Sequence, residues 1–230
     1  MPSGIEHVIC RLPLVGALLF RKWEKYLDSM ETGMRPLSDE EVTLMLQAMS
    51  GGKNAVRNQA LLKLGIFTGF RISELLSIKV GDVWDGYKVR DRVTVSKGFM
   101  KGKIEGRTMR INPAAAIGIT RWLRCAKRDN FCFLNWPLFA AQGKRKAISR
   151  QLATRVLVEA AERAGIDSKR IAGHSLRKTF AYKAWVSDGV RGDMAKMAKL
   201  LGHSNWSNTL RYIEFLDGSL DQAVMEMSVA

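Results

Sequence analysis

Eight side chains in four short segments of the sequence are of types that can act together on a phosphodiester. Two of these segments place an arginine close to another functional residue, and one is a lysine-rich stretch that contains glycines. The last segment ends in a histidine and is followed by a tyrosine. In chain order the side chains are Arg71, Glu74, Lys101, Lys103, His174, Arg177, His203 and Tyr212.

Each residue type has a use in transesterification, which needs a nucleophile, cations for the phosphoryl oxygens and an acid for the leaving oxygen. The guanidinium groups of Arg71 and Arg177 donate paired hydrogen bonds and stay charged. His203 adds a further donor for the same phosphate. His174 is the best proton acceptor for the phenol of Tyr212, since an unperturbed phenol has a pKa of about 10. Alone, each residue also has an ordinary structural explanation, but the five fall together in one chain.

The motifs around these residues resemble the catalytic domain of the tyrosine recombinases, the phage-integrase family. Thr68–Leu75 meets the pattern T-G-x-R-x-x-E-L, and His174–Ala181 meets H-x-L-R-x-T-F-A. Leu201–Tyr212 carries L-G-H followed by T-x-x-Y. The motifs occur in the family's order, and the resemblance spans roughly residues 36–215.

The resemblance implies a site-specific DNA recombinase or integrase that cuts and rejoins double-stranded DNA. Tyr212 is then the nucleophile and holds the 3′ end as a phosphotyrosine. Lys101 is the general acid that protonates the leaving 5′-hydroxyl, with Lys103 as the alternative. Glu74 supports Arg71 through hydrogen bonding. Because the bond energy stays in the phosphotyrosine, neither a metal nor a cofactor is expected.

The resemblance also implies a homo-oligomer, a tetramer on paired DNA sites, of the kind encoded by mobile elements. Two other functions remain open. A type IB topoisomerase uses similar chemistry to relax supercoils without a specific site, and a non-catalytic DNA-binding protein would form no covalent adducts. The sequence leaves open the target site and the choice between integration, excision and resolution.

The composition agrees with a DNA partner and with the cytoplasm. The chain has 37 Lys and Arg against 22 Asp and Glu, a net charge of +15, and this excess favours a polyanionic partner. Three cysteines without a C-x-x-C pair, and only three histidines, argue against a disulfide framework or a metal site. The longest apolar run, residues 12–20, is too short to span a bilayer. We therefore predict a cytoplasmic, nucleoid-associated protein with no membrane segment.

Helices and a small sheet must position the four segments. Ser38 and Glu41 form a capping box at the start of one helix, and alternating valines between residues 83 and 111 predict strands. A returning strand is expected at residues 107–111, after glycine-containing turns. Further helices are predicted over residues 55–67, from Ile72, after Pro113, from Ser149, and around residues 176–186 and 194–201. The predicted fold is α+β, mostly helical, with a small antiparallel sheet.

The charge distribution and the helical spacing of apolar residues in the last segment suggest three parts. Residues 1–34 hold four cations and four carboxylates, so the positive excess lies beyond them, and we interpret them as a linker or helical remnant. Residues 35–215 form the catalytic domain. Residues 216–230 form a C-terminal tail helix, expected to pack into a neighbouring protomer, with packing on its own domain as the alternative.

Overall fold

The computed structural model describes residues 33–96, 98, 106–128, 133–141, 144–191, 193–203 and 209. The predicted tail helix, residues 216–230, lies outside this part of the chain, as do Lys101, Lys103 and Tyr212. The chain divides after Gly33, and the described residues from Met34 onward belong to one compact unit.

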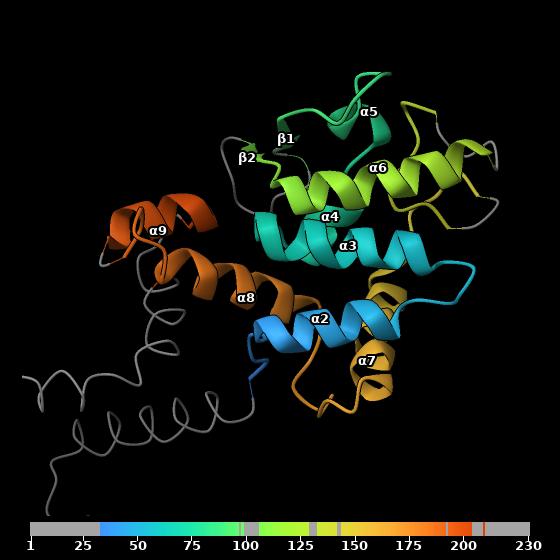
Figure 1. Cartoon of the computed structure of the whole chain (residues 1–230). Coiled ribbons are helices and arrows are strands. Elements are labelled where there is room, and N and C mark those ends of the chain that lie inside the picture. The colour runs from blue at the N-terminus through green and yellow to red at the C-terminus, as the bar shows by residue number, and fades with distance from the viewer. Residues whose placement is uncertain are drawn as a thin grey trace, which may run out of the picture. The chain divides into compact units, whose positions relative to one another are not determined.

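Helices dominate this unit, and a two-stranded antiparallel sheet accompanies them (Figure 1). This arrangement confirms the α+β prediction. The helices are α2 (Asp39–Ala48), α3 (Ala55–Thr68), α4 (Ile72–Ser77), α5 (Val80–Val83), α6 (Pro113–Arg128), α7 (Arg150–Arg163), α8 (Gly173–Trp185) and α9 (Met194–Leu201); the strands are β1 (Arg92–Val95) and β2 (Arg107–Arg110).

Helix α3 runs through the middle of the unit. It packs against α6 on one side and α8 on the other (Figure 1). Leu61, Leu62 and Leu64 are fully buried although they point in different directions around the helix. A helix that is apolar around most of its circumference needs partners on more than one side. The end of α3 is therefore fixed from both sides, and the Thr68–Leu75 motif begins there.

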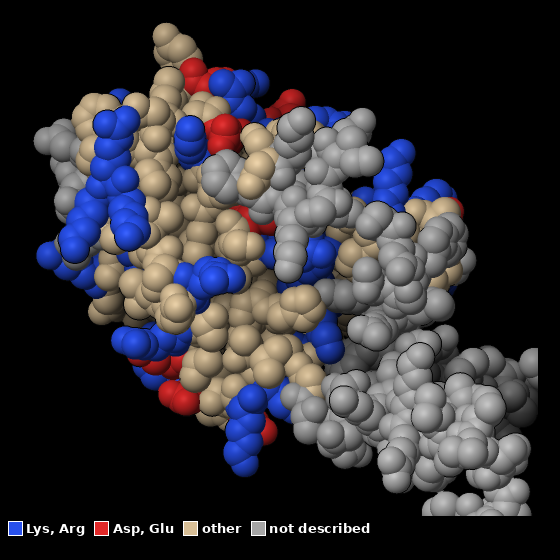
Figure 2. All heavy atoms as spheres, turned by 180° about the vertical axis from the view of Figure 1, so that it is seen from behind, with Lys and Arg blue, Asp and Glu red and all other residues tan. Residues whose placement is uncertain are grey.

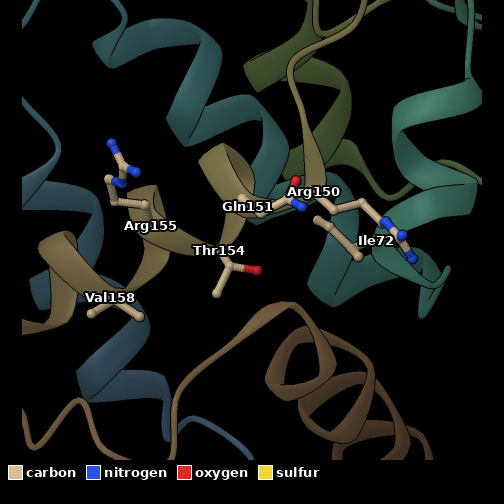
Figure 3. Close-up of a pocket in the computed structure, with 6 residues that line it drawn as sticks. All are labelled: Ile72, Arg150, Gln151, Thr154, Arg155 and Val158. Atoms are coloured by element: carbon tan, nitrogen blue, oxygen red, sulfur yellow. The ribbon is translucent and has the colours of Figure 1, made fainter.

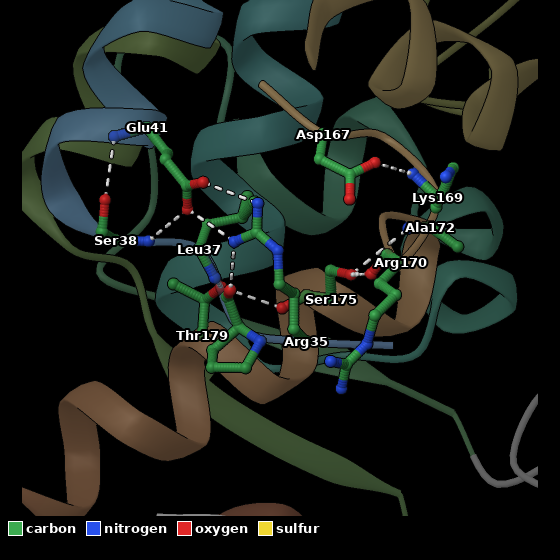
Figure 4. A network of polar contacts seen from close by, with 11 residues as sticks. Arg35, Leu37, Ser38, Glu41, Asp167, Lys169, Arg170, Ala172, Ser175 and Thr179 are labelled. Carbon is green, nitrogen blue, oxygen red and sulfur yellow. Dashed lines mark hydrogen bonds and ion pairs between the residues drawn. The ribbon is translucent and has the colours of Figure 1, made fainter. Parts of the chain in front are cut away.

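A polar network ties the start of the unit to α8 (Figure 4). Ser38 and Glu41 form the predicted capping box of α2, and Glu41 also pairs with Arg35 at 2.6 Å. The backbone N–H of Leu37 donates to the Thr179 hydroxyl of α8 at 2.8 Å. Because both partners of this last bond are buried, it anchors the helix that carries His174 and Arg177.

The sheet has the predicted strand directions but begins later than the valine pattern suggests. Arg92 pairs with Arg110 and Val95 with Arg107, which places Val93 and Val95 on the buried face. Val83, at the start of that stretch, ends the short helix α5 (Val80–Val83), and Val89 forms an isolated bridge with Trp84. Asp82 explains this difference, because its carboxylate accepts from the backbone N–H of Lys79 and caps that turn.

Candidate active site

The first motif begins where α3 ends. Gly69 adopts the left-handed conformation, with φ 58°, and its N–H donates to Gly65 O. A Cβ at Gly69 would collide with the ring of Phe180 from α8, so this turn requires glycine. The chain then extends through Arg71, whose φ is −63° and ψ 152°, into α4.

Glu74 fixes Arg71 through two contacts. One carboxylate oxygen accepts from the Arg71 backbone N–H at 2.9 Å, and the other accepts from Nη1 at 2.9 Å. Glu74 is 1% exposed, whereas the Arg71 side chain is 41% exposed. The buried carboxylate therefore holds one side of a guanidinium that still reaches the surface, where it is available to an anion.

Arg177 joins two helix ends that are far apart in the sequence. It projects from α8 and is fully buried. Its Nη1 donates to Gly69 O at 2.6 Å, and its Nη2 donates to Leu201 O at 2.5 Å. These carbonyls lie at the C-terminal ends of α3 and α9, where helices carry partial negative charge. The buried guanidinium thereby gains the polar partners that its desolvation demands.

His203 follows α9 directly and contacts the same guanidinium. Gly202 ends α9 with φ 63°, and the His203 Nε2 lies 3.0 Å from Arg177 Nη2. A guanidinium has no acceptor, so Nε2 of a neutral ring accepts in this contact. Nδ1 then carries the proton and donates to the buried hydroxyl of Thr209, 3.0 Å away.

His174 lies in the first turn of α8 and carries a depressed pKa. The residue as a whole is exposed, but desolvation by the surrounding chain and the nearby charges of Arg177, Lys178 and Arg71 lower the pKa of His174 to about 4. The start of a helix also disfavours a cation. The imidazole is therefore neutral around pH 7 and can accept a proton.

A groove next to the first motif was not identified in the sequence analysis. It encloses about 590 Å³ between α7 and the start of α4 (Figure 3). Its lining residues are Ile72, Arg150, Gln151, Thr154, Arg155 and Val158. The cap at Ser149 could have pointed to this groove. It places Arg150 in the first turn of α7 and Arg155 in the second, and both residues are exposed.

Lysine and arginine side chains are spread over the face seen in Figure 2, and acidic side chains are far fewer there. Among the described residues, no group of three or more His, Cys, Asp or Glu side chains is arranged to hold a metal ion. None of the helices in the described part of the chain is both long and apolar enough to cross a membrane.

The structure thus brings Arg177 into contact with His203 and gives His174 a pKa that Arg177 and Arg71 influence. Lys101, Lys103 and Tyr212 fall outside the described residues. Arg107 of β2, to which the sequence analysis assigned no role, is also buried and reaches the ends of α3 and α9. Its burial could not be predicted from the local sequence, because its contacts are made with segments that are 39 and 94 positions away.

Comparison with known proteins finds relatives that are named as recombinases. It is 32% identical over 157 residues to "Probable integrase/recombinase YoeC" of Bacillus subtilis (strain 168), over 68% of this chain and 77% of YoeC. It is 28% identical over 196 residues to the tyrosine recombinase XerD of Rickettsia bellii (strain RML369-C), over 82% of this chain and 62% of that protein.

The fold is also shared with a solved recombinase. The XerH site-specific recombinase bound to a palindromic difH substrate aligns with a TM-score of 0.63 and 22% identity, over 84% of this chain and 53% of that one. The chain therefore spans between about half and three quarters of these relatives. The model of the phage integrase family matches residues 35–218, which is most of the sequence, and the chain belongs to the phage integrase family.

Proposed function

We propose that this chain is the catalytic domain of a site-specific DNA recombinase or integrase that cuts and rejoins double-stranded DNA through a 3′-phosphotyrosyl intermediate. The observation that carries the proposal is the contact network of Arg177. This one side chain bonds to the turn before Arg71 and to the segment that ends in His203, so three separate motifs meet around a guanidinium. Burying a cation costs free energy unless it gains polar partners, so a buried arginine that joins three motifs is best explained by a shared function. An anionic ligand bound by all three motifs is such a function.

The roles follow from the chemistry of each group. The Tyr212 oxygen attacks the scissile phosphorus, and the bond from phosphorus to the 5′ oxygen breaks. The phenolic proton passes to His174, and Lys101, or Lys103 in its place, returns a proton to the leaving oxygen. Attack by the 5′-hydroxyl on the phosphotyrosine reverses these transfers. The energy of the phosphodiester bond is kept in the phosphotyrosine, so the cycle needs no ATP.

Arg71, Arg177 and His203 supply the contacts to the non-bridging oxygens. For His203, the phosphate replaces the contact between Nε2 and Arg177 Nη2: Nε2 then carries the donated proton, and Nδ1 accepts from the Thr209 hydroxyl. The Arg71 side chain is 41% exposed, because Glu74 occupies only one side of its guanidinium, whereas Arg177 is fully buried. The backbone bonds of Arg177 hold it close to where the phosphate charge develops. The low pKa of His174 supports its role as proton acceptor, because a charged imidazole has no lone pair to offer. A bound phosphate offsets the charges of Arg71 and Arg177 and thereby raises that pKa toward the pH at which the enzyme works.

The partner is duplex DNA, and the active form is a homo-oligomer, a tetramer on paired sites. The excess of positive charge and the exposed cations of α7 support the first part, and the family relationship supports the second. Our proposal retains the domain division predicted from the sequence, with residues 35–215 as the catalytic domain. Residues 1–34 are then a linker or helical remnant, and residues 216–230 a tail helix.

The test is covalent capture on DNA. The chain is incubated with nicked duplexes that trap the adduct, prepared from the DNA that flanks its gene, and adducts are detected on denaturing gels. Tyr212→Phe is expected to abolish the adduct and to leave DNA affinity nearly unchanged, because only the nucleophilic oxygen is lost. Tyr182→Phe serves as the control, since Tyr182 is a tyrosine with a partly exposed side chain on α8.

Three other outcomes would indicate a different nucleophile or a different function. Adducts that persist in Tyr212→Phe and vanish in Tyr182→Phe reassign the nucleophile. Relaxation of supercoils on any plasmid, without a preferred site, indicates a topoisomerase. DNA binding without adducts in the wild type contradicts the catalytic proposal.

A further inference from the structure

Arg107 opens β2 and is buried, with 7% of its surface exposed. Its Nη2 donates to Thr68 O at 2.9 Å, and its Nη1 donates to Leu201 O at 3.0 Å and to Leu200 O at 3.3 Å. A single guanidinium therefore links the last residue of α3 to the last turn of α9. These are the same two helix ends that Arg177 joins.

The side chain of Arg107 is held in place by close contacts. Its Cζ lies 4.4 Å from the centre of the Phe70 ring, and Phe70 is fully buried. A Cβ built on Gly202 would lie 3.0 Å from Arg107 Cδ, and Gly202 has a φ of 63°. The glycine that ends α9 thus also makes room for the arginine. The Phe70 ring and the bonds to main-chain carbonyls leave the guanidinium little freedom.

These contacts lie next to the proposed phosphate-binding residues. Thr68 and Phe70 lead directly into Arg71, and Leu201 lies two residues before His203. Leu201 O accepts from both Arg107 and Arg177, so two buried cations share one carbonyl. Burying a guanidinium costs free energy unless it gains strong polar contacts, and the carbonyls at helix C-termini supply them.

We propose that Arg107 is a positioning residue for the phosphate-binding set. It fixes the Arg71 turn and the His203 turn relative to Arg177, so that donors for the non-bridging oxygens are already arranged before the phosphate arrives. We assign it to the support of the site and not to the phosphate, because its guanidinium bonds to main-chain carbonyls and stacks on Phe70, whereas that of Arg177 also contacts His203. This inference rests on the function proposed for the same site.

The test compares three variants on three DNA substrates in single-turnover cleavage. Arg107→Met removes the charge and the bonds, and Arg107→Lys keeps the charge on one ammonium. Arg110→Met is the matched control, because Arg110 lies on the same strand with its side chain on the exposed face. The substrates carry an ordinary scissile phosphate, a neutral methylphosphonate, or a 5′-bridging phosphorothiolate, whose leaving thiolate needs no proton.

Arg107→Met is expected to slow cleavage of the ordinary phosphate by about 100-fold, the usual effect of a misplaced catalytic group, with DNA affinity nearly unchanged. The loss is expected to be much smaller on the methylphosphonate, because that neutral group carries no negative charge for the arginines to stabilise. The phosphorothiolate is not expected to rescue the variant. Arg107→Lys is expected to be intermediate, since one ammonium does not span both helix ends as a guanidinium fork does. Arg110→Met is expected to cleave at the wild-type rate.

Two results overturn the inference. An equal loss on phosphate and methylphosphonate means a general loss of folded protein, and rescue by the phosphorothiolate means that Arg107 acts on the hairpin lysine instead. If Arg107→Met does not fold, the cleavage rates of Arg107→Lys on the three substrates are compared instead.

A measurement without DNA separates this inference from the proposed function. The NMR signals of the His203 ring are expected to move in Arg107→Met and Arg107→Lys and to stay in place in Arg110→Met. Unmoved His203 signals overturn the positioning role even if the chain is a recombinase. A wild type without adducts contradicts the proposed function but leaves the His203 measurement decisive for Arg107.

Discussion

Glu74 and Arg71 form a pair in which one partner is buried and the other reaches the surface. Both carboxylate oxygens are used, one on the Arg71 backbone and one on its guanidinium. An accessible arginine without this support would sample many rotamers, at an entropic cost when an anion binds. The buried carboxylate therefore prepares Arg71 for a ligand before that ligand arrives.

Glu74→Gln tests this preparation. The amide keeps the shape of the side chain but places its NH₂ group against either the Arg71 backbone N–H or Nη1. One of the two buried hydrogen bonds is therefore lost. We expect a loss of about 1–3 kcal/mol in the free energy of unfolding, together with slower adduct formation. Urea denaturation and single-turnover cleavage measure the two effects. Glu40→Gln, at an exposed position of α2, is the control, and an equal loss in both variants contradicts the role of Glu74.

His174 gives the protein an acid sensitivity of its own. Its pKa is about 4 in the folded chain, against an ordinary value of 6.5, because of desolvation and neighbouring cations. Between these two values the unfolded chain binds the proton more readily than the folded chain does. The stability that His174 contributes is therefore full above about pH 6.5 and is lost as the pH falls toward 4.

His174→Gln is expected to remove that part of the acid sensitivity. The midpoint of urea unfolding falls on acidification in both proteins, because carboxylates titrate as well, but it falls less in the variant. The difference between the two midpoints is measured across the interval from about pH 7 to about pH 4.5. A constant difference over that interval would mean that the His174 pKa is not depressed.

At the scale of elements, the ends of α3 and α9 decide the geometry of the site. Each ends in a glycine with a left-handed conformation, and each supplies carbonyls to buried arginines. Gly69→Ala introduces both an unfavourable φ and a collision with Phe180. We expect a loss of about 2–4 kcal/mol in the free energy of unfolding.

The control for Gly69→Ala is Gly52→Ala. Gly52 lies in the turn after α2 and has no left-handed φ, and a Cβ added to it would meet no atom within 4 Å. Chemical denaturation of both variants gives the comparison. Equal stabilities would show that the α3 turn accommodates a side chain and that its glycine is not required.

Local signals in the sequence predicted most elements, and long-range contacts account for the rest. The caps of α2 and α7 at Ser38 and Ser149 lie where their side chains predicted them. Helix α8 begins at Gly173, earlier than its apolar spacing indicated, because the Ser175 hydroxyl accepts from the N–H of Ala172. The bonds of Arg107 were not predictable, because they join residues 39 and 94 positions apart in the sequence.

At the scale of the whole molecule, charge is the dominant feature. The net charge is +15, and residues 144–211 alone hold fifteen Lys and Arg against five Asp and Glu. One of these cations, Arg177, is buried in the structure and serves its internal geometry. The exposed ones are available to phosphates, and Arg150 and Arg155 line the groove beside Ile72 (Figure 3).

Binding to duplex DNA is therefore expected to depend steeply on salt. If ~6 phosphates are neutralised, the logarithm of the association constant falls with the logarithm of the salt concentration at a slope of about −5, because each contact releases condensed counterions. Fluorescence anisotropy over a salt series measures the slope. A slope near zero would mean that the positive charge does not face DNA.

The groove makes a sharper form of this prediction possible. Arg150→Ala and Arg155→Ala are each expected to reduce the magnitude of the slope by about 1, the contribution of one phosphate contact. Lys127→Ala is the control, since Lys127 is an exposed cation on α6, which packs on the side of α3 away from α8 (Figure 1). It is expected to leave the slope unchanged. Equal changes in all three variants would assign the salt effect to net charge and not to the face that carries α7.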